Sequence, residues 1–256
     1  MPGPSPAFAA LTYTLCAEMK LFDSSYPSPA ENLAADEALL DWAEADESLE
    51  VLRFWESTTP FVVVGYGNSV QRETNVDACA RLGIPILRRC SGGGTVVQGP
   101  GCLNFAVILQ SATAPELESI TGTNCYVMRK QRAALESVLE TEVSIRGATD
   151  LTLGDLKISG NAQRRKRRAI LFHGAILLNF DLALISATLQ QPSREPDYRG
   201  GRPHSDFLTN VGISADVVKR SIASVWRAHE VLVDIPTSYL TPLVEKHSDP
   251  AWNLKF

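Results

Sequence analysis

The chain has 256 residues, and 45% of them are hydrophobic, so it can bury a substantial core in one large domain or in two unequal ones. Its formal net charge of -5 at pH 7 excludes a general electrostatic attraction to nucleic acid or to anionic membranes. No apolar run approaches the ~20 residues that a membrane-spanning helix needs, so we expect a soluble protein.

The cysteines and the N-terminus indicate the cellular compartment in which the protein is expected. The five cysteines are scattered and include no Cys-x-x-Cys pair, which argues against a disulfide framework or a zinc site and favours the reducing cytoplasm. They are Cys16, Cys79, Cys90, Cys102 and Cys125. The first residues, 1–11, contain no Lys or Arg and therefore lack the charged start of a secretory signal. We expect residues 1–29 to be a loose lead-in and residues 30–256 to form the domain.

The first half of the chain alternates between helical and extended patterns. Apolar residues recur at helical spacing over 32–44, where Asn32 can cap the first turn. The β-rich runs 51–55 and 61–65 are separated by Thr59 and Pro60 and predict two strands. A short helix over 75–82, closed by Gly83, precedes a strand over 84–89, and another strand is expected over 104–109.

The second half continues with a helix over 126–139 and several extended runs. The expected extended runs are 142–145, 150–153, 157–159 and 169–180, and the expected helices near the C-terminus are 216–229 and 238–247. Strands come in adjacent pairs more than in strict alternation with helices, which predicts an α+β fold with a mixed, largely antiparallel sheet. Residues 190–206, rich in Pro, Gly, Arg and Asp, predict a linker or a mobile loop over a site.

A glycine-rich segment follows the expected strand at 84–89. In Arg88-Arg-Cys-Ser-Gly-Gly-Gly94, three glycines let main-chain N–H groups approach an anion or an acyl chain, and Arg88 or Arg89 can supply charge for a phosphate. The segment is not a P-loop, because Gly-Lys-Ser/Thr is missing, and it does not match Gly-x-Gly-x-x-Gly. A flexible hairpin is the structural alternative.

Two further segments hold polar residues within extended runs. Alternation places Lys157 and Ser159 on one face, where a lysine can neutralise a phosphate or polarise an acyl carbonyl; the alternative is a solvated lysine beside a turn. His173 and Gly174 lie within the apolar run 169–180. Such a histidine is either satisfied within the core or hydrogen-bonds a substrate from a pocket wall.

Four motifs in one order resemble the catalytic domain of the lipoate-protein ligase A family, within the biotin and lipoate ligase superfamily. They are Asn32-Leu-Ala-Ala-Asp-Glu-Ala38, Arg88-Arg-Cys-Ser-Gly-Gly-Gly94, Lys157-Ile-Ser-Gly-Asn-Ala162 and His173-Gly-Ala-Ile-Leu-Leu178. The resemblance covers roughly residues 30–255, and four ordered motifs are far more specific than one. It implies an enzyme that uses ATP and Mg²⁺ to attach lipoate, or a similar medium-chain acyl group, to a lysine of an acceptor protein through an acyl-adenylate.

The resemblance also implies roles for individual residues. Lys157 would be the catalytic lysine that contacts the activated carboxyl group and the phosphate, and Asp150 is a candidate Mg²⁺ contact. The residues expected to line the acyl-adenylate site are Arg89, Ser91, Gly92, Gly93, Gly94, Asn104, Ser159, Gly160, His173 and Gly174. The expected acceptors are lipoyl domains of the 2-oxoacid dehydrogenase E2 type or the glycine cleavage H protein type.

The sequence departs from the family pattern at three points. The small C-terminal domain of typical bacterial ligases has no counterpart here, so we expect either a partner subunit for activation or transfer from a preformed adenylate only. After the glycines, Val97-Gln98-Gly99 replaces an aromatic-His-Asp stretch, and Thr149 replaces an Asn before Asp150. These two changes bear on nucleotide or metal handling.

Three alternatives remain beside the ligase. An octanoyl transferase would use a cysteine thioester, but neither 141–156 nor 181–212, where such enzymes place it, contains cysteine. Cys90 and Cys102 flank the glycines and could approach the site. A non-catalytic lipoate- or acceptor-binding relative is disfavoured by the intact Lys157, and a biotin ligase by the missing Gly-Arg-Gly-Arg loop.

The basic run Gln163-Arg-Arg-Lys-Arg-Arg168 offers a hypothesis of another class, a nucleic-acid-binding module. It lacks interleaved aromatic residues and lies where a loop is expected between two motifs, so we favour a docking loop for an acidic acceptor domain. Charge reversal at Arg164 and Arg165 should then weaken transfer, and unchanged transfer kinetics would count against this role.

Overall fold

The computed structural model describes residues 19–256, so Cys16 and residues 1–18 of the expected lead-in lie outside the described residues. The fold is α+β, as predicted, with an eight-stranded sheet and a three-stranded sheet. The order of strands in the large sheet is β11 (Glu230–Val231), β1 (Lys20–Asp23), β2 (Val51–Trp55), β6 (Cys102–Gln110), β10 (Ala169–Leu177), β9 (Leu156–Arg165), β8 (Asp150–Leu153) and β7 (Ser144–Arg146).

Most strand pairs in the large sheet are antiparallel, and only β1 runs parallel to its two neighbours. The small sheet has the order β4 (Ile86–Arg88), β3 (Phe61–Val64) and β5 (Val96–Gln98), with β3 parallel to β4 and antiparallel to β5. The prediction of a mixed, largely antiparallel architecture is therefore confirmed.

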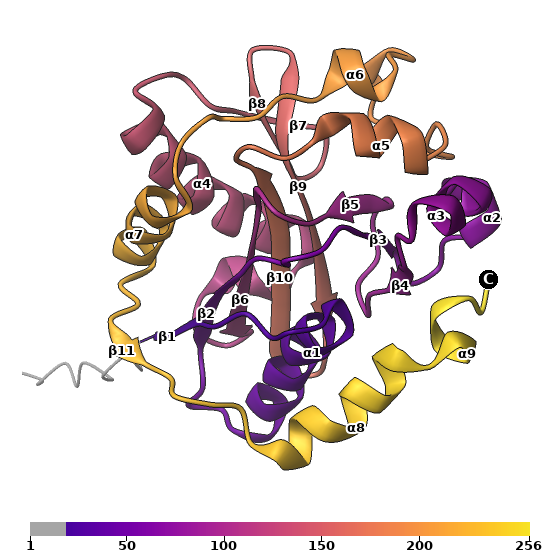
Figure 1. Cartoon of the computed structure of the whole chain (residues 1–256). Helices are drawn as coiled ribbons and strands as arrows, with labels where there is room; N and C mark the ends of the chain where they lie inside the picture. Colours follow the sequence, from indigo (N-terminus) through magenta and orange to yellow (C-terminus); the bar gives the residue numbers. More distant parts are fainter. Residues whose placement is uncertain (1–18) are drawn as a thin grey trace, which may run out of the picture.

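Helices cover both faces of the large sheet (Figure 1). α1 (Pro29–Ala45) and α8 (Thr237–Ser248) pack together on one face, and α4 (Ile120–Leu139) and α7 (Ala215–Trp226) pack together on the other. The remaining helical segments are short. They are α2 (Val70–Glu73), α3 (Val76–Leu82), η1 (Pro115–Glu118), α5 (Leu182–Thr188), η2 (Asp197–Arg199), α6 (His204–Phe207) and α9 (Pro250–Asn253). None of the helices described is long and apolar enough to cross a membrane.

Strand alternation assigns side chains to the two faces. On β2, Leu52 and Phe54 join the core beneath α4 and α7, whereas Val51 joins the core beneath α1. The same alternation places Arg53 and Trp55 on the α1 side, because successive side chains of a strand point to opposite faces. The candidate site lies on the α1 side of the large sheet, between the large and small sheets.

The start of α1 differs from the prediction. Ser28, not Asn32, is the cap: its Oγ accepts a hydrogen bond from the Glu31 backbone N–H at 3.2 Å, and the Glu31 carboxylate accepts one from the Ser28 N–H at 2.9 Å. Asn32 is buried within the first turn and donates to the carbonyl oxygens of Tyr26 and Ser28. A serine followed three residues later by a glutamate forms a capping box, which stabilises the earlier start.

Several other boundaries differ from expectation, those of α4 and β9 the most. α4 begins at Ile120, six residues early, because Ser119 caps it. β9 continues to Arg165, so the basic run expected as a loop is the end of a strand and its turn into β10. The short helix 75–82 is confirmed as α3, with Asn75 as its cap and Gly83 in the left-handed region at a φ of 64°.

Candidate active site

A cavity of about 300 Å³ lies between the two sheets and collects most of the predicted site residues. Those that line it are Arg89, Gly93, Gly94, Asn104, Asp150, Lys157, Gly160, His173 and Gly174. The predicted residues Ser91, Gly92 and Ser159 do not line it: Ser91 and Ser159 are buried, and Gly92 lines a neighbouring hollow.

The floor of the cavity is one row of residues across the large sheet. Trp55 on β2 pairs with Asn104 on β6, Asn104 pairs with Ala175 on β10, and Ala175 pairs with Gly160 on β9. Strands lie about 4.8 Å apart, so this row spans ~14 Å. Lys157 lies next to the β9 end of the row, so the cavity runs across the strands, away from the lysine and toward Trp55.

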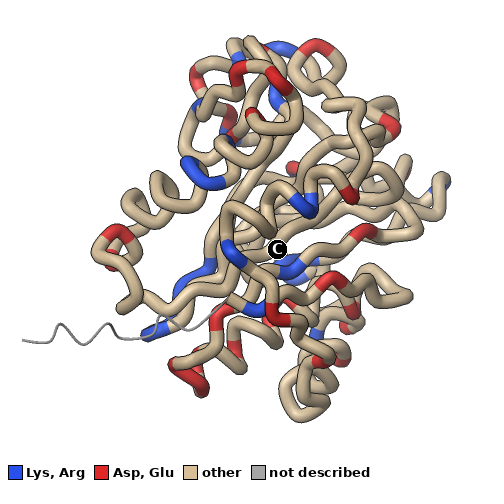
Figure 2. The backbone as a smooth tube through the Cα atoms, turned by 90° about the vertical axis from the view of Figure 1, so that its left-hand side faces the viewer, with Lys and Arg blue, Asp and Glu red and all other residues tan. Residues whose placement is uncertain are grey.

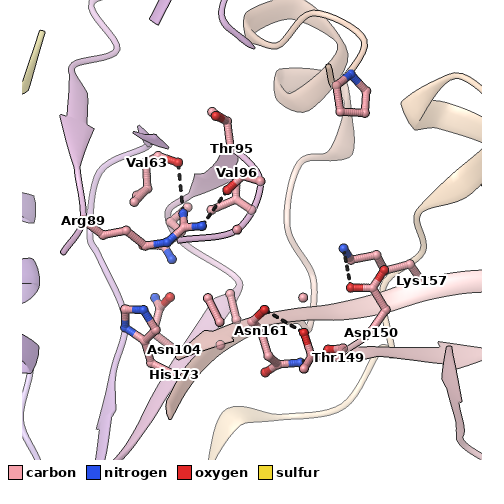
Figure 3. A pocket seen from close by; sticks show the side chains of 18 of the residues that line it. Val63, Arg89, Thr95, Val96, Asn104, Thr149, Asp150, Lys157, Asn161 and His173 are labelled. Carbon is pink, nitrogen blue, oxygen red and sulfur yellow. Dashed lines mark hydrogen bonds and ion pairs between the residues drawn. The ribbon is translucent and has the colours of Figure 1, made fainter. Parts of the chain in front are cut away.

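Lys157 is held at its end of the cavity by a carboxylate. Its Nζ lies 2.8 Å from Asp150 Oδ1, and the Tyr198 hydroxyl donates to Asp150 Oδ2 at 2.8 Å. Burial and the neighbouring Asp150 charge raise the pKa of Tyr198, so the phenol stays protonated and can donate. A Cβ at Gly160 would lie 2.8 Å from Lys157 Nζ, so the glycine leaves the space that the ammonium occupies. Figure 3 shows this pair across the cavity from Arg89 and His173.

Arg89 stabilises the glycine loop, residues 92–94, by hydrogen bonds to its carbonyl oxygens. Its guanidinium donates to the carbonyl oxygens of Gly92 and Gly94 at 2.6 and 2.7 Å. Burial lowers the pKa of Arg89 to about 10, which leaves it charged at neutral pH. Gly93 has a φ of 86°, a left-handed conformation that favours glycine. Arg88, the other arginine considered for a phosphate, is fully buried outside the cavity, where it donates to the carbonyl oxygens of residues 65, 66 and 68.

His173 lies within a buried polar chain. Its Nδ1 lies 3.0 Å from Asp36 Oδ2, its Nε2 lies 2.6 Å from Ser91 Oγ, and Asp36 Oδ1 accepts a hydrogen bond from Arg53 at 2.5 Å. Burial alone would raise the pKa of Asp36, but the Arg53 charge and the hydrogen bond from His173 together hold it below its usual range. Ser91 is fully buried and outside the cavity lining. The chain therefore fixes the His173 ring and does not present a serine nucleophile.

The structure adds residues to which the sequence analysis gave no role. Asp36 belongs to a quoted motif and Gln98 to a stretch that departs from the family pattern, whereas Trp55 carried no signal. The expected loop 190–206 covers part of the cavity, to which it contributes Pro192, Arg194, Pro196, Arg199 and His204. Burial lowers the pKa of His204, and the charges of Arg199 and Lys157 act in the same direction. The richness of residues 190–206 in Pro, Gly and Arg was the sequence signal available for this loop.

No described cysteine lines the cavity. Cys79, Cys90 and Cys102 are buried, and Cys125 is exposed on α4. Burial raises the pKa of Cys90, and it raises that of Cys102 to about 12, so both thiols stay protonated at neutral pH. Neither is a thiolate nucleophile in this arrangement.

Metal-binding groups are sparse. Among residues 19–256, no cluster of three or more His, Cys, Asp or Glu side chains could hold a metal ion. Asp150 and Asp36 are the carboxylates of the cavity lining, and Asp36 is paired with Arg53. Mg²⁺ commonly binds one or two carboxylates together with substrate phosphates, so Asp150 fits a Mg²⁺ ion that enters with a nucleotide better than a permanent metal centre.

Comparison with known proteins assigns the chain to a family. The family model of the lipoyl protein ligase A/B catalytic domain matches residues 28–222, and the chain belongs to this family. A candidate lipoate-protein ligase A from Aeropyrum pernix is 30% identical over 154 residues, which cover 60% of this chain and 55% of that protein. The chain thus spans about half the length of that relative.

Other relatives are named for different activities. The octanoyltransferase LipM of Geobacillus kaustophilus is 29% identical over 198 residues, covering 68% of this chain and 70% of that protein. Lipoate-protein ligase A subunit 1 of Thermoplasma acidophilum is 29% identical over 191 residues, covering 73% of this chain and 72% of that protein. A crystal structure of lipoate-protein ligase A bound with ATP aligns with a TM-score of 0.79 and 25% identity, covering 93% of this chain and 98% of that one.

Proposed function

We propose that this protein attaches a lipoyl group, or a similar medium-chain acyl group, to a lysine of a lipoyl acceptor domain in the cytoplasm by way of an acyl-adenylate. The observation that carries this proposal is the position of Lys157. The Lys157 ammonium packs against Gly160, and its Nζ lies 2.8 Å from Asp150 Oδ1. The glycine loop and His173 line the same cavity. In the part of the chain that the structure describes, no cysteine lines this cavity.

The chemistry takes place in two steps. The carboxylate of the acyl group attacks the α-phosphorus of ATP, and pyrophosphate leaves. The amine of the acceptor lysine then attacks the acyl carbonyl, loses a proton, and displaces AMP. Lys157 contributes fixed positive charge beside the carbonyl and phosphate oxygens, where negative charge develops during both attacks. Gly93 and Gly94 also line the cavity, and in this proposal their backbone N–H groups bind the acyl-adenylate together with Asn104 and Gly174.

Magnesium and ATP belong to the first step. Mg²⁺ neutralises phosphate oxygens when bound. Asp150 is the proposed protein contact, and because Lys157 and Tyr198 engage its two oxygens, such a contact requires Asp150 to release one of them. The relative solved with ATP supports nucleotide binding in this family.

An octanoyl transfer from a carrier protein is the second candidate, and the octanoyltransferase LipM relative favours it. If that transfer proceeds through a cysteine thioester, it needs a thiolate beside the acyl carbonyl. The buried, protonated Cys90 and Cys102 do not meet this need, so we favour the ligase.

The proposed partners are lipoyl acceptor domains and a separate accessory subunit. The Thermoplasma relative is named as subunit 1 of a ligase, which supports a second chain for the activation step. The basic run is a weaker candidate for acceptor docking than its composition suggested. Arg165 is engaged with the Leu117 carbonyl and the Thr123 hydroxyl, whereas Arg164 is exposed over the Tyr66 ring and stays a candidate.

Intact-mass spectrometry of a lipoyl acceptor domain tests this function. The protein is incubated with the acceptor and one of three donors: lipoate with ATP and Mg²⁺, synthetic lipoyl-adenylate, or an octanoyl carrier protein. We expect a lipoyl mass increase with the adenylate, and with ATP either alone or after the accessory subunit is added. Modification from the carrier protein only would contradict the ligase assignment.

A further inference from the structure

The ladder of hydrogen bonds between β8 and β9 does not reach Asp150. It ends at the pair formed by Leu151 and Ser159, and its register shifts between Leu151 and Thr152. Asp150 is the first residue of β8, one residue beyond this end, and it pairs with Arg146 on the edge strand β7. The backbone of Asp150 can therefore move away from β9 unless another contact holds it there.

Thr149 and Asn161 supply such a contact. The Thr149 hydroxyl donates to the Asn161 backbone carbonyl at 2.8 Å, and Asn161 Nδ2 donates to the Thr149 backbone carbonyl at 2.6 Å. Thr149 directly precedes Asp150, and Asn161 lies on β9. Figure 3 shows both residues beside the pair formed by Lys157 and Asp150. The two hydrogen bonds thus continue the connection between β8 and β9 past the end of the ladder.

The amide of Asn161 has one orientation that satisfies this contact. Its Nδ2 must face Thr149, because a backbone carbonyl oxygen accepts a hydrogen bond and cannot donate one. Its Oδ1 lies on the side of Gly174, the residue that pairs with Asn161 on β10. A Cβ at Gly174 would lie 1.7 Å from this oxygen, so a larger residue would displace the amide. Gly174 therefore leaves the space in which Asn161 can hold Thr149.

The Asp150 carboxylate in turn sets the position of Lys157. Lys157 Nζ lies 2.8 Å from Asp150 Oδ1, and the two side chains are only 23% and 14% exposed. An ion pair with so little solvent contact is screened less than a pair on the surface. A shift of about 1 Å in a reacting group can cost about a hundredfold in rate, so the contact that places Asp150 bears on the chemistry at Lys157.

We propose that Thr149 and Asn161 are positioning residues, whose two hydrogen bonds hold the Asp150 carboxylate, and through it the Lys157 ammonium, in the arrangement that acyl transfer needs. The inference rests on the proposed function, because it concerns the lysine assigned to that reaction. Both residues act through Asp150 and not on the acyl group.

The first test is the single-turnover rate of lipoyl transfer from preformed lipoyl-adenylate to an acceptor domain, which bypasses ATP and Mg²⁺. Thr149→Val removes the hydroxyl and keeps the branched shape. We expect the rate to fall about tenfold, while the dissociation constant of a non-reactive lipoyl-adenylate analogue stays within about threefold of the wild-type value. Thr149→Ser retains the hydroxyl and should keep the rate within about threefold of the wild type. Thr58→Val makes the same change at an exposed bend between β2 and β3 and should match the wild type.

A double-mutant cycle tests whether Thr149 acts through Asp150. In a protein that carries Asp150→Asn, Thr149→Val should change the rate by less than about twofold, because the charge that Thr149 positions is already absent. Additive effects of the two substitutions would overturn the inference. A Thr149→Ser variant as slow as Thr149→Val would overturn it as well.

A crystal structure of Thr149→Val tests the inference independently of activity. We expect Lys157 Nζ and Asp150 Oδ1 to separate beyond the ion-pair limit of about 4 Å. A distance that stays at 2.8 Å would overturn the inference, whatever the rate. A wild-type protein that transfers nothing from lipoyl-adenylate would refute the proposed function alone, and the structure of the variant would still decide the role of Thr149.

Discussion

Lys157 and His173 differ in what surrounds them, and this difference separates their roles. Lys157 is partly exposed to the cavity and has one carboxylate partner, Asp150, which a substrate anion can replace. His173 is held at both ring nitrogens by Asp36 and Ser91. The lysine is thus available to an incoming anion, whereas the histidine forms a fixed wall.

Asp36 offers a prediction at this scale. Replacing Asp36 by Asn removes the negative partner of Arg53, which is completely buried, and loosens His173. An uncompensated buried charge costs about 3–5 kcal/mol, so we expect the free energy of unfolding in urea to fall by this order. The control, Asp41→Asn, removes a partly exposed pair with Lys166 and should cost less than about 1 kcal/mol. Equal losses in the two variants would contradict the buried network.

The two helices on the cavity side of the large sheet are joined by an ion pair. Glu37 on α1 accepts hydrogen bonds from Lys246 at 2.7 and 2.8 Å and lies 2.9 Å from His247 Nε2, both on α8. Burial acts to raise the pKa of Glu37, but the hydrogen bonds and charges of His247 and Lys246 lower it from 4.5 to about 2. The motif that holds Asp36 therefore also anchors α8 against α1.

This anchor predicts a pH dependence of stability. Because the pKa of Glu37 is lower in the folded protein, its contribution is present above about pH 4.5 and is lost as the pH falls toward 2. Glu37→Gln should lower the free energy of unfolding at pH 7 by up to ~3 kcal/mol, and by progressively less in acid. Urea unfolding of both proteins from pH 7 to pH 3 measures this. A deficit independent of pH would contradict it, and Glu47→Gln at an exposed pair serves as control.

Some element ends set by local chemistry could be predicted, although the local caps Ser28 and Ser119 were missed, and ends set by tertiary contacts could not be predicted. Asn75 and Gly83 bound α3 as expected, because each satisfies the helix end within its own turn. The basic run was expected to be a loop, but Arg165 extends β9 because its guanidinium reaches the Leu117 carbonyl and Thr123, 42 or more residues away in sequence. No local pattern shows such a contact.

Across the whole molecule, charge is mixed, and the site depends on how the two sheets meet. In the view of Figure 2, acidic and basic positions are interspersed. The ordered motifs gave the residues around Lys157 and the glycine loop, because these lie in a few short segments. That Trp55 and Gln98 line one cavity could not be predicted, since Trp55 lies on the large sheet and Gln98 on the small one.

The most direct test of the central claim is the single-turnover rate of lipoyl transfer from preformed lipoyl-adenylate to an acceptor domain, in the wild type and in Lys157→Met. Fixed charge at a reacting centre is typically worth about 10²–10³ in rate, so we predict a loss of this size with the fold preserved. A Lys157→Met variant that transfers the lipoyl group within about threefold of the wild-type rate would contradict the assignment of Lys157 as the catalytic residue.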